Sequence, residues 1–420
     1  MMNTTINQEV LYYPSDDINR AVQQLEAPFF IYEERRLREN LRNFRDSFRQ
    51  YFPDFIPLFA VKANPNPQIL RIVMDEAYGF DCSSESETWI VDRLNGQGMF
   101  TGNFNTESDL QTALEAGLTL NLDDINLIPI IEQIGIPEAI SFRINPDITH
   151  GGMESLKVAG QNAKFGIPYE RAVEAYRIAQ QMGVKRFGIH MMVGSNILDT
   201  EHFPKIIERL FEIIAEIRDE TGIEIEFMNM GGGFGVPYHP EERSLNIDSV
   251  ASYVRRVFDE QCIKFNLKEP RLMAEPGRFI SANTAWLVTG VTVIKESYKK
   301  FVGVDACTTM MPRPAIYDAY HHVSVLNKDS SSENLESVSI VGRLCENNDF
   351  FAKDRLLPEI DNNDILIIHN SGGHAYAMAS NYNGFLRPAE YLLDQSGEIR
   401  MIRRAETIKN LYSRTCVNLV

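Results

Sequence analysis

The sequence predicts an α/β protein made of a closed (β/α)8 barrel, similar to a TIM barrel, and a mainly β C-terminal domain. Short apolar segments bounded by turns alternate with segments whose apolar residues recur at helical spacing. Eight such strand-like segments lie between residues 55 and 274, and eight parallel strands are the number that closes a barrel of this type. After Ile280 further strand-like segments follow without regular helices, which indicates a second domain.

The elements follow in chain order. Residues 1–27 are polar, 28–32 form a strand candidate, and 33–51 carry apolar residues at helical spacing. An open doubly wound sheet is the alternative architecture, but no glycine-rich dinucleotide turn follows the first regular strand. The predicted barrel strands are Phe55–Val61, Tyr78–Cys82, Gly98–Thr101, Leu118–Leu122, Ala139–Ile144, Arg186–Val193, Ile225–Met230 and Arg271–Ala274, with helices such as Ser84–Asn95, Glu107–Ala116, Tyr169–Met182 and Phe203–Thr221 between them.

The domain boundaries follow from this change of pattern. We expect residues 35–281 to form the barrel, which would bind the cofactor inferred below. Residues 1–34 and 282–420 would form the β domain, which would complete the active site and the dimer interface. The predicted C-terminal strands are Ala285–Ile294, Lys300–Val304, Val338–Val341 and Ile365–His369.

Composition limits the class of function. The chain has 420 residues, of which 44% are hydrophobic, and a formal net charge of -17, which disfavours broad binding to nucleic acid or anionic membranes. The five cysteines are scattered without a CxxC pair, so we expect reduced thiols and neither a disulfide framework nor a zinc site. The N-terminus lacks the basic and apolar regions of a signal peptide and no apolar run approaches transmembrane length, so we expect a cytoplasmic protein.

The first predicted barrel strand carries a lysine at its end. The stretch Pro57–Pro65 is apolar up to Lys62 and is stopped by Asn64-Pro65. A lysine in apolar surroundings loses solvation, so we expect burial to lower its pKa and provide the neutral amine that a Schiff base needs. The alternative is a strand-end lysine that extends to solvent.

Polar residues at the ends of the other strands test this interpretation, because all of them line one mouth of such a barrel. Three glycines after the seventh strand allow backbone N–H groups to approach an anion, while Ser195 and Arg278 add side-chain donors. Glu275 is a carboxylate suited to pair with a protonated ring nitrogen. An amine, a phosphate site and a carboxylate in one mouth indicate pyridoxal phosphate. The cofactor-contact residues predicted here are Lys62, Asp81, Arg143, Ser195, Gly231, Gly232, Gly233, Glu275, Gly277 and Arg278.

Motifs across both domains resemble the alanine-racemase-fold (fold type III, group IV) pyridoxal-phosphate-dependent amino acid decarboxylases, and most closely the diaminopimelate decarboxylases. The matching segments include 59–64 (FAVKAN), 142–146 (FRINP), 164–166 (KFG), 231–233 (GGG), 275–278 (EPGR), 313–320 (RPAIYDAY), 345–346 (CE) and 380–383 (SNYN).

The resemblance implies roles for individual residues. Lys62 would carry the cofactor through a Schiff base, and Glu275 would keep its ring nitrogen protonated. Cys345 would reprotonate the carbon after carbon dioxide leaves, reaching the site from the partner subunit of a homodimer. The residues implied to bind the substrate are Arg278, Arg313 and Tyr317 for its distal carboxylate, Glu346 for its distal amino group, and His374.

Two positions depart from the family pattern. Where relatives carry a histidine that stacks on the cofactor ring, this chain has Met192, and a thioether can still pack on an aromatic face. Where relatives carry a tyrosine that touches phosphate and substrate, this chain has His374. We therefore expect decarboxylation of meso-diaminopimelate, with a divergent paralogue acting on another amino acid as the alternative.

Two further classes of function remain as alternatives. An amino acid racemase uses the same barrel and lysine but would need a tyrosine as second base and would not need Cys345 with Glu346. A regulator without catalytic activity is disfavoured, because the lysine, the glycine triplet and the carboxylate are all present. The histidines form no ligand pattern, so no metal site is expected.

Overall fold

The computed structural model describes residues 6–147, 159–328 and 334–416, and the chain divides into two compact units. The barrel unit comprises Arg38–Val236 and Ser244–Ile280. The β unit comprises Met1–Leu37, Pro237–Arg243 and Ser281–Val420. The segment Pro237–Arg243 therefore belongs to the β unit, although it lies between two barrel segments in the sequence. In the part of the chain that the structure describes, no helix is long and apolar enough to cross a membrane.

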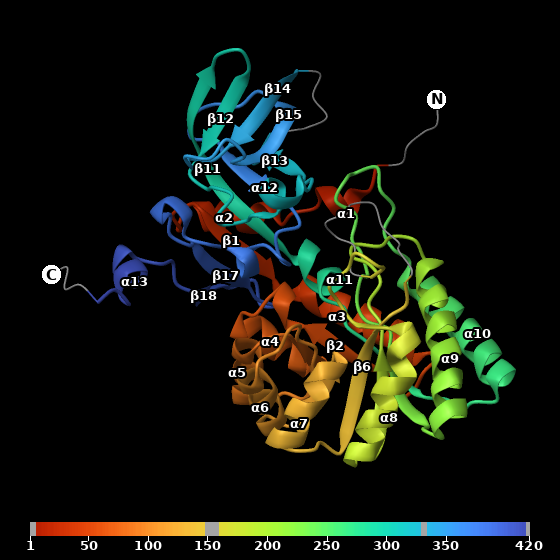
Figure 1. The fold of residues 1–420 in the computed structure, drawn as a ribbon. Coiled ribbons are helices and arrows are strands. Elements are labelled where there is room, and N and C mark those ends of the chain that lie inside the picture. Colours follow the sequence, from red (N-terminus) through yellow and green to blue (C-terminus); the bar gives the residue numbers. More distant parts are fainter. Residues whose placement is uncertain (1–5, 148–158, 329–333, 417–420) are drawn as a thin grey trace. The chain divides into compact units, whose positions relative to one another are not determined.

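Eight parallel strands of the described residues form a closed barrel, which confirms the predicted architecture (Figure 1). Neighbouring strands pair in the order β5-β4-β3-β2-β10-β9-β8-β6, and β5 pairs in turn with β6, which closes the sheet into a barrel. The short β7 (Ile167–Pro168) pairs with β6. The barrel strands are β2 (Ile56–Ala60), β3 (Gly79–Cys82), β4 (Gly98–Phe100), β5 (Thr119–Leu122), β6 (Ala139–Asn145), β8 (Arg186–His190), β9 (Ile225–Asn229) and β10 (Arg271–Ala274).

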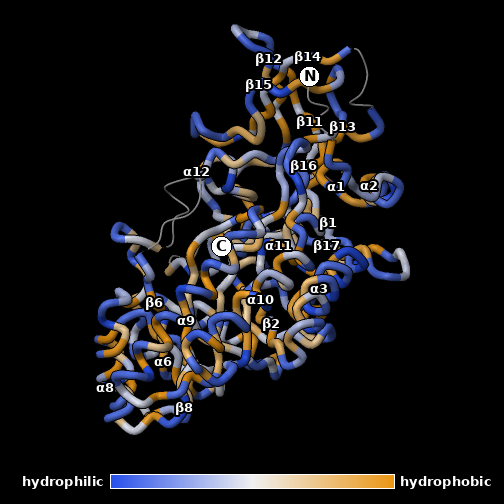
Figure 2. Tube along the Cα trace, turned by 90° about the vertical axis from the view of Figure 1, so that its right-hand side faces the viewer, coloured by the Kyte–Doolittle hydropathy of each residue, from blue (hydrophilic) through white to orange (hydrophobic). Residues whose placement is uncertain are grey.

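Helices lie around these strands, and their ends follow from local sequence (Figure 1). Thr106 and Asp109 form a capping box at the start of α6, and Asn66 followed by Pro67 begins α4. Hydrophobic and hydrophilic stretches alternate along the barrel elements in Figure 2, as expected for helices that bury one face. The helices are α3 (Glu34–Arg49), α4 (Pro67–Asp75), α5 (Glu85–Arg93), α6 (Glu107–Glu115), α7 (Ile128–Ile134), α8 (Ala172–Met182), α9 (His202–Thr221), α10 (Ile247–Phe265) and α11 (Arg278–Ser281).

The β unit contains a second sheet, in which the N-terminal strand β1 (Phe29–Glu33) lies between β11 and β17. Sequence patterning did not predict β13, β15, β17 or β18. The other strands are β11 (Ala285–Glu296), β12 (Lys300–Val304), β13 (Val323–Val325), β14 (Leu335–Val341), β15 (Phe350–Pro358), β16 (Ile365–Ile368), β17 (Ala389–Leu393) and β18 (Ile399–Arg403), and the short helices are α1 (Gln8–Leu11), α2 (Ser15–Val22), α12 (Arg313–Tyr317) and α13 (Ile408–Tyr412).

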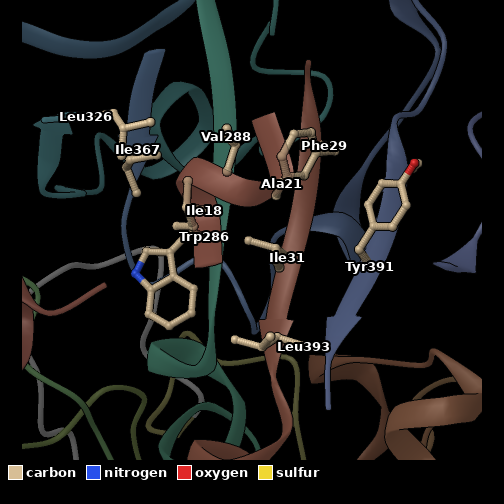
Figure 3. Packing of buried hydrophobic residues seen from close by; sticks show 11 residues of the cluster. Ile18, Ala21, Phe29, Ile31, Trp286, Val288, Leu326, Ile367, Tyr391 and Leu393 are labelled. Carbon is tan, nitrogen blue, oxygen red and sulfur yellow. The ribbon is translucent and has the colours of Figure 1, made fainter. Parts of the chain in front are cut away.

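The core of the β unit joins segments that are far apart in the sequence. Phe29 and Ile31 of β1 pack with Trp286 and Val288 of β11, and Ile18 of α2 lies on the same cluster (Figure 3). All five are buried, so they contribute hydrophobic stabilisation as fully enclosed side chains. The N-terminal segment is therefore an integral part of this sheet.

A buried glutamate is the shared anionic partner of three arginines of α3 in the barrel unit. The Glu76 side chain is 7% exposed, and its carboxylate accepts hydrogen bonds from Arg42 at 2.7 and 2.9 Å and from Arg38 at 3.1 Å. Arg45 Nη1 lies 3.5 Å from the same carboxylate. The hydrogen bonds from Arg42 are the main cause that lowers the pKa of Glu76. This cluster therefore stabilises the contact of α3 with the end of α4.

Replacing Glu76 with glutamine is expected to lower the free energy of unfolding by about 1–2 kcal/mol, because three guanidinium groups lose a shared charged acceptor while Arg42 remains partly in solvent. Chemical denaturation at neutral pH measures this change. The control is Asp46→Asn, which removes an exposed partner of Arg45 and should change stability by less than about 1 kcal/mol. Equal effects of the two substitutions would contradict the role of the cluster.

Two histidines make the β unit sensitive to acid. Burial, followed by the charge of Arg355, lowers the pKa of His322 to about 4, and burial lowers the pKa of His369 well below its ordinary value. The folded chain therefore binds fewer protons than the unfolded chain as pH falls through the ordinary histidine range. Stability is fully present above pH 6.5 and is lost as pH falls toward 4, by up to about 3 kcal/mol for His322.

Replacing His322 with asparagine is expected to make the thermal midpoint less dependent on pH between 6.5 and 4. Scans at several pH values, on wild type and variant, measure the slope. A slope that stays unchanged in the variant would show that His322 is protonated equally in the folded and unfolded chain.

Candidate active site

The polar residues predicted at the strand ends do come together in the barrel unit. Each comes at the carboxyl end of a barrel strand or within the next few residues, so the parallel order of the strands brings them to one mouth. Lys62 lies in the short 3-10 helix Val61–Ala63, directly after β2. The other predicted members are Asp81 of β3, Arg143 of β6 and Glu275 after β10, and His190 at the end of β8 and Asn229 at the end of β9 lie among them.

Lys62 forms an ion pair with the buried Asp81. Its Nζ lies 2.9 Å from Asp81 Oδ2, and the lysine side chain is 47% exposed while that of the aspartate is fully buried. Burial by itself lowers the pKa of Lys62, but the charges of Asp81 and Glu275 outweigh it and raise the pKa. The expectation of a lowered pKa was therefore wrong, because it considered burial without the two carboxylates. Burial raises the pKa of Asp81 to about 6.

Glu275 is the central anion of the mouth. It is buried, and it accepts a hydrogen bond of 2.7 Å from Asn229 Nδ2, while its other oxygen lies 3.2 Å from His190 Nε2. Burial alone would raise the pKa of Glu275, but His190, Lys62 and Arg143 lower it to about 2. The carboxylate therefore stays charged at any neutral pH. His190 Nδ1 is buried and has no hydrogen-bond partner among the described residues.

The turn 231–233 after β9 requires glycine at each of its three positions. Gly231 and Gly233 have φ angles of +71° and +91°, a region that side chains disfavour. A Cβ atom on Gly232 would lie 2.6 Å from the backbone oxygen of Glu275, so only glycine fits there. The turn is held by a hydrogen bond from Gly231 N–H to Asn229 Oδ1 at 2.9 Å. Sequence reasoning did not predict Asn229, although its place at the end of β9 was a usable signal.

Met192 makes a contact that the sequence did not predict. Its sulfur accepts the backbone N–H of Gly232 at a distance of 3.1 Å. Ser195 follows in the same loop and is half-buried. This loop runs beside the glycine turn, because Ile197 forms a bridge with Phe234. The stacking role of Met192 stays a prediction.

Two arginines complete the predicted cofactor-contact residues of the barrel unit. Arg143 is buried, and its guanidinium lies 4.6 Å from the ring centroid of Phe165. Arg278 begins α11 and is also buried. The preceding Gly277 allows a close approach, because a Cβ atom on it would lie 3.0 Å from the Cβ of Ala63, beside Lys62. Both cations are thus built into the barrel unit at strand ends.

The predicted residues of the β unit include an exposed cysteine on a well-anchored loop. Cys345 is exposed, and its backbone N–H donates to Asn383 Oδ1 at 2.7 Å. Asp349 holds the same loop, since its carboxylate accepts from Leu344 N–H at 2.8 Å and from the N–H and hydroxyl of Thr308 at 2.7 and 2.8 Å. These bonds restrict the backbone on both sides of the thiol.

The helix α12 carries Arg313, which is buried, and Tyr317, which is half-buried. Asn348, three residues after Cys345, hydrogen-bonds the backbone oxygen of Ala315, so α12 and the cysteine loop lie together. Glu346 is exposed on that loop. His374 lies in a turn after β16 with a φ angle of +55°. Within the β unit, the structure therefore groups Arg313, Tyr317, Cys345 and Glu346.

The residues of the barrel unit fit pyridoxal phosphate. A lysine amine, a buried carboxylate that stays ionised, and a glycine turn in which a side chain would collide with backbone are the groups that this cofactor needs for its aldehyde, ring nitrogen and phosphate. The unpartnered His190 Nδ1 adds a buried polar atom next to Glu275. The described residues contain no cluster of three side chains that could hold a metal ion.

Comparisons with known proteins agree with this site. Residues 35–282 match the family described as "Pyridoxal-dependent decarboxylase, pyridoxal binding domain". Diaminopimelate decarboxylase of Methanothermobacter thermautotrophicus is 38% identical over 394 residues, covering 92% of this chain and 90% of that protein. Protein TabA of Pseudomonas amygdali pv. tabaci is 39% identical, covering 91% and 89%.

A solved structure shows the same architecture. Diaminopimelate decarboxylase of M. jannaschii in co-complex with L-lysine has a TM-score of 0.88 and 29% identity, covering 96% of this chain and 94% of that chain. The fold, the geometry of the barrel mouth and these similarities agree. The chain belongs to the pyridoxal-dependent decarboxylases, among relatives that include the diaminopimelate decarboxylases.

Proposed function

We propose that this protein decarboxylates meso-diaminopimelate to L-lysine and carbon dioxide with pyridoxal phosphate as cofactor. The observation that carries the proposal is the barrel mouth, where Lys62 pairs with Asp81 beside the buried, ionised Glu275. The similarity to diaminopimelate decarboxylases over more than nine-tenths of the chain supports the substrate. Bound pyridoxal phosphate supplies an electron-withdrawing ring that takes up the electron pair released when the carboxylate leaves as carbon dioxide.

The residues of the chain provide the rest of the chemistry. Lys62 supplies the amine that binds the cofactor, and Asp81 holds this amine in place through their ion pair of 2.9 Å. Glu275 remains anionic and would hold the ring nitrogen in its protonated form. Residues that would hold the phosphate or line the cofactor are Arg143, Met192, Ser195, Gly231, Gly232, Gly233, Gly277, Arg278 and His374.

The resemblance to the family implies which residues would bind the substrate. Arg278, Arg313 and Tyr317 would bind the distal carboxylate, Glu346 would bind the distal ammonium, and His374 would contact the substrate. Cys345 would donate the proton to the carbon from which carbon dioxide leaves. Its exposure on an anchored loop is compatible with a thiol that serves another subunit. We therefore propose a homodimer with shared active sites, in which residues 1–34 and 282–420 complete the site and form the interface.

Mixing two inactive variants tests the shared site. Lys62→Arg and Cys345→Ala protein, exchanged into mixed dimers, should regain activity, because one of the two sites then has both residues intact. Mixtures that stay inactive after verified subunit exchange would contradict a shared site.

The substrate is tested by product analysis on the purified holoenzyme. We expect carbon dioxide and lysine from meso-diaminopimelate, and no release from L- or D-ornithine, lysine, arginine or glutamate. Release from another amino acid alone would exclude the proposed substrate. Retained cofactor without any release would point to a protein that binds but does not decarboxylate.

A decarboxylase of another amino acid is the second candidate. It is favoured by Met192, which stands where the family carries a histidine. The sulfur of Met192 contacts the N–H of Gly232 in the predicted cofactor site. The 39% identity to protein TabA shows that relatives of this degree of similarity are not all named diaminopimelate decarboxylase. The same product analysis separates the two candidates.

All five cysteines are free thiols, which supports the proposal of a cytoplasmic protein.

A further inference from the structure

A histidine in the β unit orients the guanidinium of Arg313. His321 Nε2 lies 3.0 Å from Arg313 Nη1, and the Cζ atom of Arg313 lies 4.5 Å from the ring centroid of Tyr238. Arg313 is 6% exposed and His321 is fully buried. Tyr238 belongs to the short segment Pro237–Arg243, which the β unit takes from the middle of the barrel sequence.

The surroundings of His321 determine its tautomer. Its Nδ1 lies 2.8 Å from the backbone oxygen of His369, and a carbonyl oxygen can only accept a hydrogen bond. Nδ1 therefore carries the proton. In the neutral ring Nε2 then has a free lone pair, which accepts the N–H of Arg313. A proton on Nε2 would instead place two donors against each other, so the contact requires neutral His321.

The sheet fixes this arrangement. The antiparallel pair of β13 and β16 continues beyond its last residues, because His369 N–H donates to the backbone oxygen of His322 at 2.9 Å. This pairing places the carbonyl of His369 next to His321. Arg355 donates to the backbone oxygen of His321 at 3.1 Å, and the Tyr238 ring meets the His321 ring edge-on at 5.1 Å. The imidazole itself thus contacts the carbonyl of His369, the guanidinium of Arg313 and the ring of Tyr238.

We propose that His321, neutral and protonated on Nδ1, is a positioning residue that orients Arg313 toward the distal carboxylate of the substrate, with the Tyr238 ring supporting the guanidinium. The inference rests on the proposed function. Neither His321 nor Tyr238 is an anion, so these contacts orient Arg313 without neutralising its charge. A guanidinium fixed in this way loses less freedom when it forms a bidentate pair with a carboxylate.

Asparagine variants of two adjacent histidines test the proposal in the holoenzyme. His321→Asn retains a donor for the carbonyl of His369 but cannot reach Arg313. We expect it to raise KM for meso-diaminopimelate by about tenfold or more with little change in kcat. His322→Asn is the matched control, because His322 contacts Tyr320 and His369 instead, and it should leave both constants unchanged at pH 8. His321→Gln, whose side-chain oxygen reaches the position of Nε2, should restore part of the loss.

Inhibition by L-lysine and by cadaverine separates positioning from a general structural role, since the product lysine retains the distal carboxylate and cadaverine lacks it. His321→Asn should weaken inhibition by lysine about as much as it raises KM, and should change the inhibition constant of cadaverine by less than about twofold. An unchanged KM for diaminopimelate, or an equal weakening of lysine and cadaverine, would overturn the proposal.

A spectroscopic readout is independent of turnover. Nitrogen-15 spectra of histidine-labelled wild type, with His321 assigned through the variant, should show the Nδ1–H tautomer at neutral pH. The Nε2–H tautomer or a protonated ring would overturn the proposal. If wild type does not decarboxylate diaminopimelate, the proposed function fails by itself, and the tautomer still decides whether His321 is an acceptor for Arg313.

Discussion

Lys62→Arg is expected to abolish covalent retention of pyridoxal phosphate and to lower turnover by about 10³-fold or more, the order seen when a covalent nucleophile is removed from an enzyme. Arginine stays protonated and cannot supply the neutral amine that a Schiff base requires. It retains the positive charge beside Asp81, so stability should change little. Dialysis followed by visible absorbance measures cofactor retention, and borohydride reduction with peptide mapping should place the cofactor on Lys62 in wild type.

Lys62→Met is the companion variant. It removes the same amine and also the charge, so the buried carboxylates Asp81 and Glu275 lose a cation that now compensates them. We therefore expect the same loss of activity as in Lys62→Arg, together with a lower thermal midpoint of the apoprotein. If either variant retained cofactor after dialysis and reduction, the assignment of Lys62 would be wrong.

The barrel was predictable from sequence because its strands repeat a simple pattern. Parallel strands that are covered by helices are apolar throughout, and turns bound them at regular intervals. The β unit was less predictable, since its strands carry buried polar residues. Glu390 is the second residue of β17 and is buried, and its charge is compensated because Tyr32 donates to it at 2.7 Å and Arg403 pairs with it. These partners come from β1 and β18, so no local pattern shows that the acid is neutralised.

The sequence was sufficient to predict which residues form the candidate site, but not the direction in which their pKa values shift. Strand ends identified Lys62, Asp81 and Glu275, because the barrel geometry alone brings such positions to one mouth. The direction of the lysine pKa depends on distances between residues far apart in the chain, which a sequence does not contain. The same holds for the Met192 sulfur, whose contact with Gly232 arises only when the loop after β8 meets the turn after β9.

Glu275 differs from Asp81 in its surroundings, although both carboxylates are buried in the same mouth. The pKa of Asp81 is raised to about 6, whereas that of Glu275 is lowered to about 2 by His190 and the nearby cations. Only Glu275 is therefore fully ionised down to mildly acidic pH. Two buried carboxylates with pKa values on either side of the ordinary range fit separate proposed tasks, a counter-ion for Lys62 and a permanent anion.

Glu275→Gln is expected to lower kcat by about 10²–10³-fold while the protein still binds pyridoxal phosphate through Lys62. Glutamine has nearly the same shape and its side-chain oxygen can still accept the N–H of Asn229, so the change removes the charge and little else. Without that charge the ring nitrogen of the cofactor would lose its proton, and the ring would withdraw electrons less strongly. Visible spectra, cofactor dissociation constants and single-turnover rates measure these effects separately. The control is Asp81→Asn, which removes the other buried carboxylate and should mainly alter the rate at which cofactor attaches to Lys62. If Glu275→Gln retained wild-type kcat, or if Asp81→Asn reproduced its entire effect on turnover, Glu275 would not be the permanent anion of the site.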